Sequence, residues 1–166
     1  MSQTVELRPM TPAEYERFLQ RNLARYVQEL LRTGQTDVEA HAVAEAQGAL
    51  DEGLPNGMDT PLHYFLAAEA DGAVVGEVWC DTTEPETVFL NDFYVYEPHR
   101  RQGRGAAMLR AVETIAERGE FGRIVTHVFH TNRAALALFA AHGYLPCGGE
   151  ENGTIFLQKQ YPAPAR

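Results

Sequence analysis

Arg100-Arg101-Gln102-Gly103-Arg104-Gly105 is the stretch of sequence that decides the fold. It follows the apolar run Val88–Val95 and precedes apolar residues at helical spacing from Met108 to Ile115. A strand, a Gly-rich turn and a helix start in this order can bind phosphate, because first-turn N–H groups lack intrahelical partners and the helix dipole favours an anion. Gly103 and Gly105 have no Cβ, so a pyrophosphate can approach the main chain closely.

Charge supports the same interpretation. The chain has 166 residues and a net charge of -9, which argues against nucleic acid as a partner and favours cationic ones. Basic side chains nevertheless gather around the turn, at Arg100, Arg101, Arg104 and Arg110.

Two other phosphate-binding loops are excluded. Position 108 is Met, so the third glycine of the dinucleotide fingerprint is missing. No Lys-Ser or Lys-Thr pair closes a nucleoside-triphosphate loop. A Gly-x-Gly on its own could also indicate a flexible turn before a helix that binds no phosphate.

A second motif downstream resolves this choice. The first motif is Arg100-x-x-Gly103-x-Gly105. The two motifs together make the sequence from about Val88 to Tyr144 resemble the GNAT N-acetyltransferase superfamily. The residues of the second motif are Asn132, Ala135, Leu138, Phe139, Gly143 and Tyr144, with Phe139 where the family usually has Tyr. The irregular stretch from Leu54 to His63 resembles an uncharacterised bacterial branch, and residues 1–60 otherwise match only as a pattern of elements.

The pattern of elements predicts the α/β GNAT fold, with a mixed central sheet in the order β-α-α-β-β-β-α-β-α-β-β. We expect one domain over residues 1–160 and a loose tail over 161–166. Two capping boxes predict helix starts. The first helix begins at Thr11–Glu14 and ends at Gly34, and the second begins at Thr36–Glu39 and ends near Leu50. The stretch Asp51–Pro61 is expected to be irregular. Two further helices are expected, from the Gly-rich turn to about Gly119 and over Asn132–His142. The expected strands are Val5–Arg8, His63–Ala70, Ala73–Cys80, Thr87–Val95, Arg123–Phe129, Tyr144–Cys147 and Thr154–Lys159, with tight turns at Asp71-Gly72 and Gly148–Gly153.

The resemblance implies a site for acetyl-CoA between two parallel strands that splay apart. Pantetheine would pair with the edge of the first strand, and Asn132 would contact it, act as a helix N-cap, or do both. The implied cosubstrate-binding residues are Phe93, Tyr94, Val95, Arg100, Arg101, Gln102, Gly103, Arg104, Gly105, Ala106, Asn132 and Phe139. Phe139 cannot protonate a leaving thiolate, which leaves Tyr94, Tyr144 and water as alternatives.

His127 is the first candidate for the catalytic base. It lies five residues before Asn132, where related protein N-terminal acetyltransferases carry a Glu or His, and an imidazole with a pKa near 6.5 suits the task. A satisfied core histidine is the alternative. Asp92 is the second candidate, because a carboxylate within an apolar run is costly to bury unless it is paired or used; it could orient His127, bind an ammonium group, or face solvent. Glu77, Asp92 and His63 are the candidate acceptor-binding residues.

These features predict an acetyl-CoA-dependent N-acetyltransferase that acts by direct attack in a ternary complex. The expected acceptor is a primary amine of a peptide or protein N-terminus or of a small cationic molecule, drawn in by acidic residues. A non-catalytic acyl-CoA-binding sensor or assembly module is the alternative, with Phe139 as its best support. No metal site is expected, and a homodimer is left open. Two cysteines, no signal-like character in Met1–Glu6 and no membrane-length apolar run lead us to expect a cytoplasmic protein without a membrane partner.

Overall fold

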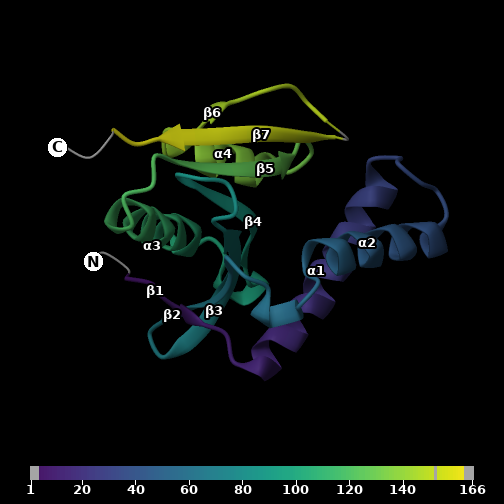
Figure 1. The fold of residues 1–166 in the computed structure, drawn as a ribbon, viewed down its shortest axis with the longest axis horizontal. Coiled ribbons are helices and arrows are strands. Elements are labelled where there is room, and N and C mark those ends of the chain that lie inside the picture. The colour runs from purple at the N-terminus through teal and green to yellow at the C-terminus, as the bar shows by residue number, and fades with distance from the viewer. Residues whose placement is uncertain (1–3, 152, 163–166) are drawn as a thin grey trace.

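A mixed seven-stranded sheet in the order β1-β2-β3-β4-β5-β7-β6 organises the chain (Figure 1). The computed structural model describes residues 4–151 and 153–162. Neighbouring strands are antiparallel except for β4 and β5, which pair in parallel. The strands are β1 Glu6–Pro9, β2 His63–Ala70, β3 Ala73–Asp81, β4 Thr87–Val95, β5 Arg123–Phe129, β6 Leu145–Pro146 and β7 Thr154–Gln160. This is the α/β GNAT fold that the sequence predicts.

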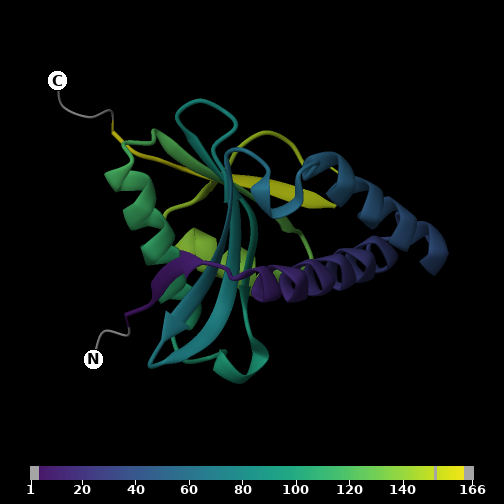
Figure 2. The ribbon, with the colours of Figure 1, turned by 60° about the horizontal axis from the view of Figure 1, so that its bottom comes forward.

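Helices cover both faces of the sheet. They are α1 Pro12–Arg32, α2 Glu39–Gly53, α3 Arg104–Arg118 and α4 Arg133–Ala141, with short 3-10 turns η1 Gly57–Asp59 and η2 Glu97–His99. The pair α1–α2 stands on one side of the sheet and α3 lies on the other (Figures 1 and 2). None of the helices in the described ranges is both long and apolar enough to cross a membrane.

The two predicted capping boxes have different outcomes. At α1 both bonds of the box form: the Glu14 N–H donates to Thr11 Oγ1, and the Glu14 carboxylate accepts from the Thr11 N–H at 2.9 Å. At α2 the prediction is wrong. The helix begins after Val38 without a side-chain cap, because the Thr36 hydroxyl accepts from the Val38 N–H instead, and α2 then continues to Gly53 through part of the stretch expected to be irregular.

The β2–β3 hairpin turns at Asp71-Gly72 as predicted. Both residues have positive φ, 53° and 78°, which matches the right-handed twist of the two strands. The helix Asn132–His142 is also confirmed in its essentials, since Asn132 is the N-cap and α4 runs from Arg133 to Ala141. The turn expected over Gly148–Gly153 contains Asn152, which lies outside the described residues.

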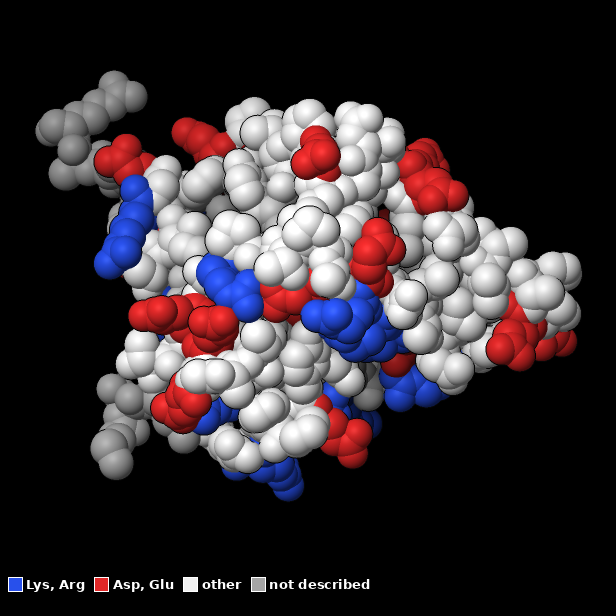
Figure 3. All heavy atoms as spheres, turned by 90° about the horizontal axis from the view of Figure 1, so that it is seen from below, with Lys and Arg blue, Asp and Glu red and all other residues white. Residues whose placement is uncertain are grey.

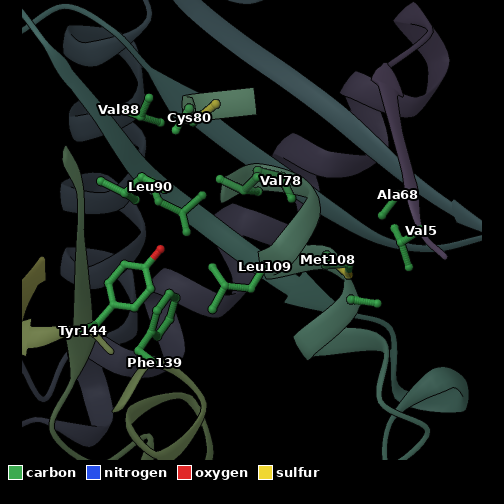
Figure 4. Close-up of a cluster of buried hydrophobic side chains, with 14 of the residues drawn as sticks. Val5, Ala68, Val78, Cys80, Val88, Leu90, Met108, Leu109, Phe139 and Tyr144 are labelled. Carbon is green, nitrogen blue, oxygen red and sulfur yellow. The ribbon is translucent and has the colours of Figure 1, made fainter. Parts of the chain in front are cut away.

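The largest hydrophobic core lies between the sheet and α3 (Figure 4). Met108 and Leu109 of α3 are fully buried there beside Val78 and Leu90. A second cluster under α1 packs Phe18 against Phe65 and Trp79. The two cores hold α1 and α3 against opposite faces, which leaves the C-terminal half of β4 between them.

Tyr161, the first residue of the expected loose tail, is bonded to the folded structure. The Tyr161 N–H donates to the Gly122 carbonyl at 2.8 Å, and its hydroxyl donates to Glu113 Oε2 at 3.1 Å. The aromatic ring and its polar group both have partners, so Tyr161 belongs to the folded structure. Residues 163–166 of the predicted tail lie outside the described residues.

Candidate active site

The parallel strands β4 and β5 separate part of the way along their length. They pair from Thr87 with Arg123 to Leu90 with Thr126, and each strand continues beyond without the other. Two β5 side chains bond to β4 carbonyls at this fork. Thr126 Oγ1 donates to the Leu90 carbonyl at 3.0 Å, and His127 Nε2 lies 3.3 Å from the Asn91 carbonyl.

An irregularity in β4 accompanies the fork. Trp79 pairs with Asp92 while Cys80 pairs with Leu90, so Asn91 is an extra residue in the ladder. Beyond it, the Tyr96 N–H donates to the Val75 carbonyl, which places Tyr96 in a hydrogen-bonded position toward β3. Because antiparallel strands alternate, the backbone groups of Phe93 and Val95 point the other way, into the gap between β4 and β5.

The Gly-rich turn leads from β4 into the start of α3. Arg101 and Gly103 have φ values of 63° and 75°, and Gly103 is the N-cap without any side-chain cap. The first bond of the helix runs from the Ala107 N–H to the Gly103 carbonyl. Within the described residues the N–H groups of residues 103–106 therefore donate to no protein acceptor, and they are available to an anion.

Not all arginine side chains of this turn are available to bind an anion. Arg100 donates from Nε to the Val95 carbonyl at 2.9 Å and lies over the Tyr94 ring. Arg101 is exposed and forms no ion pair with another described residue. The Arg104 side chain is buried and pairs with Asp71 at 2.8 Å, so the prediction that it adds positive charge to the phosphate site is wrong. Only its N–H can serve there.

His127 lies at the fork, and one of its ring nitrogens has no hydrogen-bond partner in the described part of the chain. A carbonyl can only accept, so Nε2 carries the hydrogen and the lone pair of the neutral ring is on Nδ1. The ring lies beside Phe89 and Phe156. Burial lowers the pKa of His127 below its ordinary value, opposed by the bond to Asn91 and by the nearby charge of Asp92, so the imidazole is neutral at pH 7.

Asp92 faces α1 from β4. Its Oδ2 accepts from the Asn22 amide at 3.1 Å and from the Arg25 guanidinium. Burial raises the pKa of Asp92, while the Arg25 charge and the Asn22 bond oppose that rise. The carboxyl group is thus partly shielded from water. It lies on the same side of the sheet as His127, because side chains alternate along a strand and Ile124 and Val128 of β5 face the α3 core, so His127 faces the other side.

Glu77 is not an open acidic residue, which corrects one expectation from the sequence. Its side chain is 0% exposed and accepts from Arg21 Nε at 3.1 Å, Arg25 Nη2 at 3.0 Å and the Tyr96 hydroxyl at 2.9 Å. Two arginines therefore neutralise Glu77 and Asp92, and an acceptor ammonium cannot reach the Glu77 carboxylate directly. More widely, acidic and basic side chains lie side by side over the face seen in Figure 3.

Other predicted residues lie in different surroundings. His63 is on β2, separated from β4 by β3, and its Nδ1 accepts from the Trp79 indole at 3.0 Å. The structure does not bring it to His127 or Asp92. Asn132 Oδ1 accepts from the Ala135 N–H at 3.1 Å, so Asn132 caps α4 as one of its two expected roles. No group of three or more His, Cys, Asp and Glu in the described ranges is arranged to hold a metal ion.

Phe139 of α4 belongs to the main hydrophobic core and contacts β4. It is buried and packs edge-on against Phe93 and Tyr144, with ring centroids 5.9 and 5.0 Å apart. The Tyr144 hydroxyl is buried and has no hydrogen-bond partner among residues 4–151 and 153–162, and burial raises the pKa of Tyr144. A phenol of raised pKa is a poor proton donor to a thiolate, so Tyr144 fits that role badly.

Three functional candidates on α1 were missed at the level of sequence: Arg21, Asn22 and Arg25. The signal lies in the spacing along the helix, since Asn22 and Arg25 follow the buried Phe18 by four and seven residues and so share its face of α1. Polar residues continuing a buried stripe could have signalled a polar partner on the sheet. That partner is the pair Glu77 and Asp92.

The chain is similar in sequence to known proteins. The acetyltransferase (GNAT) family model matches residues 19–144. The chain is 33% identical over 145 residues to the uncharacterized N-acetyltransferase YdgE of Bacillus subtilis, a match that covers 83% of this chain and 90% of that protein. It is 28% identical over 146 residues to the uncharacterized N-acetyltransferase YycN of the same organism, with 85% and 92% covered.

Solved structures agree in fold. The crystal structure of YycN superimposes with a TM-score of 0.83 at 25% identity over 89% of this chain and 96% of that one. The PaiA N-acetyltransferase of Thermoplasma acidophilum, solved in complex with coenzyme A, has a TM-score of 0.69 at 15% identity over 97% and 100% of the two chains. With its family match over most of its length, its forked sheet and its open helix start, the chain belongs to the acetyltransferase (GNAT) family.

Proposed function

We propose that this GNAT N-acetyltransferase moves the acetyl group of acetyl-CoA to a primary amine by direct attack in a ternary complex. The observation that carries the proposal is the fork between β4 and β5, where a neutral His127 with a free Nδ1 stands beside the unpaired edge of β4. The amine belongs to a peptide or protein N-terminus or to a small molecule.

Acetyl-CoA would lie across the fork, and the residues present fit it. The free N–H groups at residues 103–106 would take the pyrophosphate, with Arg101 and Gln102 beside them. The outward backbone groups of Phe93 and Val95 would pair with the pantetheine arm. The Val95 carbonyl already accepts from Arg100. The pantetheine arm can therefore bond to this carbonyl only if the Arg100 side chain moves, and otherwise it contacts Val95 through the N–H alone.

The chain's own groups supply the proton transfer. An alkylammonium has a pKa of about 10 and must lose a proton before attack. His127 Nδ1 would accept that proton, directly or through one water, with Asp92 as the second candidate base. The N–H groups of the β4 edge are the donors available to the carbonyl oxygen as it becomes negative.

Departure of the thiolate needs no phenol at position 139. A thiol has a pKa of about 8.5, so the CoA sulfur leaves tolerably as an anion near neutral pH and takes a proton afterwards from water. Phe139 instead packs against Phe93 and Tyr144.

A thiol-release assay tests the proposal. Acetyl-CoA is incubated with the protein and a broad panel of primary amines, and free CoA is measured against a no-amine blank. Amine-dependent release is expected. Tight CoA binding by calorimetry with no release for any amine would instead favour the non-catalytic acyl-CoA-binding module, which the absence of a tyrosine at 139 makes the second candidate.

A further inference from the structure

We propose that the pocket between α1 and α2 is a second ligand site, which takes a small amphipathic amine. The ammonium group of the ligand would lie at Asp51 and its apolar body between leucines of the two helices. An oxygen atom at its inner end would accept a hydrogen bond from Tyr15. The site goes beyond the proposed function, because none of the residues that line it belongs to β4 or β5.

The two helices pack closely at one end only. Near their connection, Val27 and Leu30 of α1 pack with Ala42 and Ala46 of α2, and all four side chains are buried. Figures 1 and 2 show the two helices side by side, and toward the start of α1 they enclose a pocket of about 240 Å³. Pockets for drug-sized ligands measure about 300–1,000 Å³, so the occupant of this one is small.

The walls of the pocket are apolar. Leu19 and Leu23 of α1 and Leu50 of α2 line it and are only partly buried. Leu54, the C-cap of α2, also lines it and is buried. Removing the exposed parts of these side chains from water is favourable, so the pocket favours a ligand with an apolar body.

A buried phenol opens into this pocket. Tyr15 is 5% exposed, and its ring packs against Phe18 and Phe65. Its hydroxyl has no hydrogen-bond partner in the described ranges, and it is not one of the polar atoms that are sealed from solvent there. The hydroxyl lies near Gly57, which also lines the pocket, since a Cβ on Gly57 would be 3.7 Å from it.

This hydroxyl is a donor that awaits an acceptor. Burial raises the pKa of Tyr15, so the phenol keeps its hydrogen at neutral pH. A buried polar group without a partner destabilises the folded protein unless water or a ligand bonds to it. An oxygen atom on the ligand would satisfy the hydroxyl.

Asp51 gives the rim of the pocket a negative charge. It is exposed, its Oδ1 accepts from Gln47 at 2.9 Å, and its Oδ2 has no partner among the described residues. Asp51 lies in the last turn of α2, where the helix dipole favours a cation, yet this turn has no basic residue. Among the described residues, no Lys or Arg lines the pocket. Charge therefore selects a cationic ligand over an anionic one.

A ligand with a polar group at each end meets both requirements. Asp51 lies at the exposed rim, whereas the Tyr15 hydroxyl belongs to a buried side chain. An ammonium group and an oxygen atom at opposite ends of a short apolar body can therefore bond to the two residues together. Tyramine has this pattern, with a ring between its ammonium group and its phenol oxygen.

Three matched probes test the site: tyramine, phenethylamine, which lacks the oxygen, and phloretate, in which a carboxylate replaces the ammonium group of tyramine. NMR titration of the isotope-labelled protein without acetyl-CoA excludes turnover and locates the ligand. Tyramine should shift the backbone resonances of residues 15–23 and 47–57. It should bind about 2- to 10-fold more tightly than phenethylamine, the value of one hydrogen bond. Phloretate should bind at least about 3-fold more weakly than tyramine.

Two pairs of variants make the test specific. Tyr15→Phe keeps the ring and removes only the hydroxyl, so the advantage of tyramine over phenethylamine should vanish while the melting temperature does not fall. Tyr26→Phe is its control, because Tyr26 is also on α1 but does not line the pocket. Asp51→Asn should remove the preference for tyramine over phloretate, and Glu52→Gln, the exposed neighbour outside the pocket, should keep it.

Several results would overturn the proposal. These are no saturable shift with any probe, shifts confined to the fork at residues 91–95 and 127, and phloretate that binds as tightly as tyramine. An advantage of tyramine over phenethylamine that persists in Tyr15→Phe would also overturn it. None of these measurements involves acetyl transfer, so the proposed function stands or falls separately in the thiol-release assay.

Discussion

The chemistry of His127 depends on a single backbone carbonyl. Asn91 O can only accept, so it fixes the hydrogen of the ring on Nε2 and leaves the lone pair on Nδ1. Burial beside Phe89 and Phe156 disfavours the charged ring and lowers its pKa. The imidazole is thereby kept in its basic form throughout the neutral pH range.

Replacement of His127 by Ala should therefore lower kcat by about 10²-fold or more, which is the usual scale for loss of a general base. In the wild type, protonation of His127 removes activity as pH falls. Because its pKa is lowered, the acid limb of kcat/KM should have its midpoint below pH 6.5. The limb should vanish in His127→Ala. Rates measured from pH 5 to 9 check both points.

The control for this variant is His41→Ala, since His41 is exposed on α2 and far from the fork. It should leave both kcat and the pH profile unchanged. An acid limb that persists in His127→Ala with a similar kcat would make His127 structural and transfer the role of base to Asp92, whose carboxyl pKa is raised by burial.

At the scale of elements, the start of α3 carries the anion site through its backbone. Gly103, the N-cap, has φ of 75° and makes no side-chain cap. Gly103→Ala and Gly103→Glu impose the same left-handed strain, of order 1–3 kcal/mol, but only Glu adds a negative charge. We expect CoA to bind Gly103→Glu at least about 10-fold more weakly than Gly103→Ala. This difference in affinity should become smaller at high salt concentration.

Calorimetric titration of CoA at low and high ionic strength gives that comparison, and circular dichroism establishes that both variants fold. Equal CoA affinities in the Ala and Glu variants at low salt would count against a phosphate site at this helix start.

The packing of α3 on β3 depends on Gly76. A Cβ at this position would lie 2.4 Å from the Tyr94 carbonyl oxygen and 2.8 Å from Met108 Sδ, in a region that is fully buried. Gly76→Ala should therefore lower the free energy of unfolding by about 1–3 kcal/mol, the cost of overpacking a core. Urea unfolding measures it, and Gly48→Ala on α2, where a Cβ meets nothing within 4 Å, serves as the control.

Much of this element structure could be predicted from the sequence, since local signals determine it. Pro12 and Glu14 define the start of α1, and Asp71-Gly72 defines the β2–β3 turn. The ion pairs between α1 and the sheet could not be predicted, because Arg25 and Asp92 are 67 positions apart and no local pattern relates them. The burial of Arg104 was missed for the same reason: its partner Asp71 is 33 positions away.

At the scale of the molecule, the fork divides the sheet into two halves that each have their own support. On one side β1–β4 carry α1, and on the other β5, β7 and β6 follow, while the α3 core spans both (Figure 1). The gap between β4 and β5 is therefore the place where a ligand can join two parts of one sheet. Binding there should stabilise the whole chain, because only the folded protein has the fork.

CoA at 100 times its Kd should add about 2.7 kcal/mol of stability and raise the melting temperature by about 5–10 °C. The protection should have a definite location. Two sets of N–H groups have no protein acceptor among the described residues. Those of Phe93 and Val95 point into the gap, and those of residues 103–106 point away from the start of α3. Both sets should exchange quickly in the free protein. Hydrogen-exchange mass spectrometry with and without CoA should show slowing there and no change in α2. A rise in melting temperature with protection confined to α1 and α2 would mean that CoA binds outside the fork.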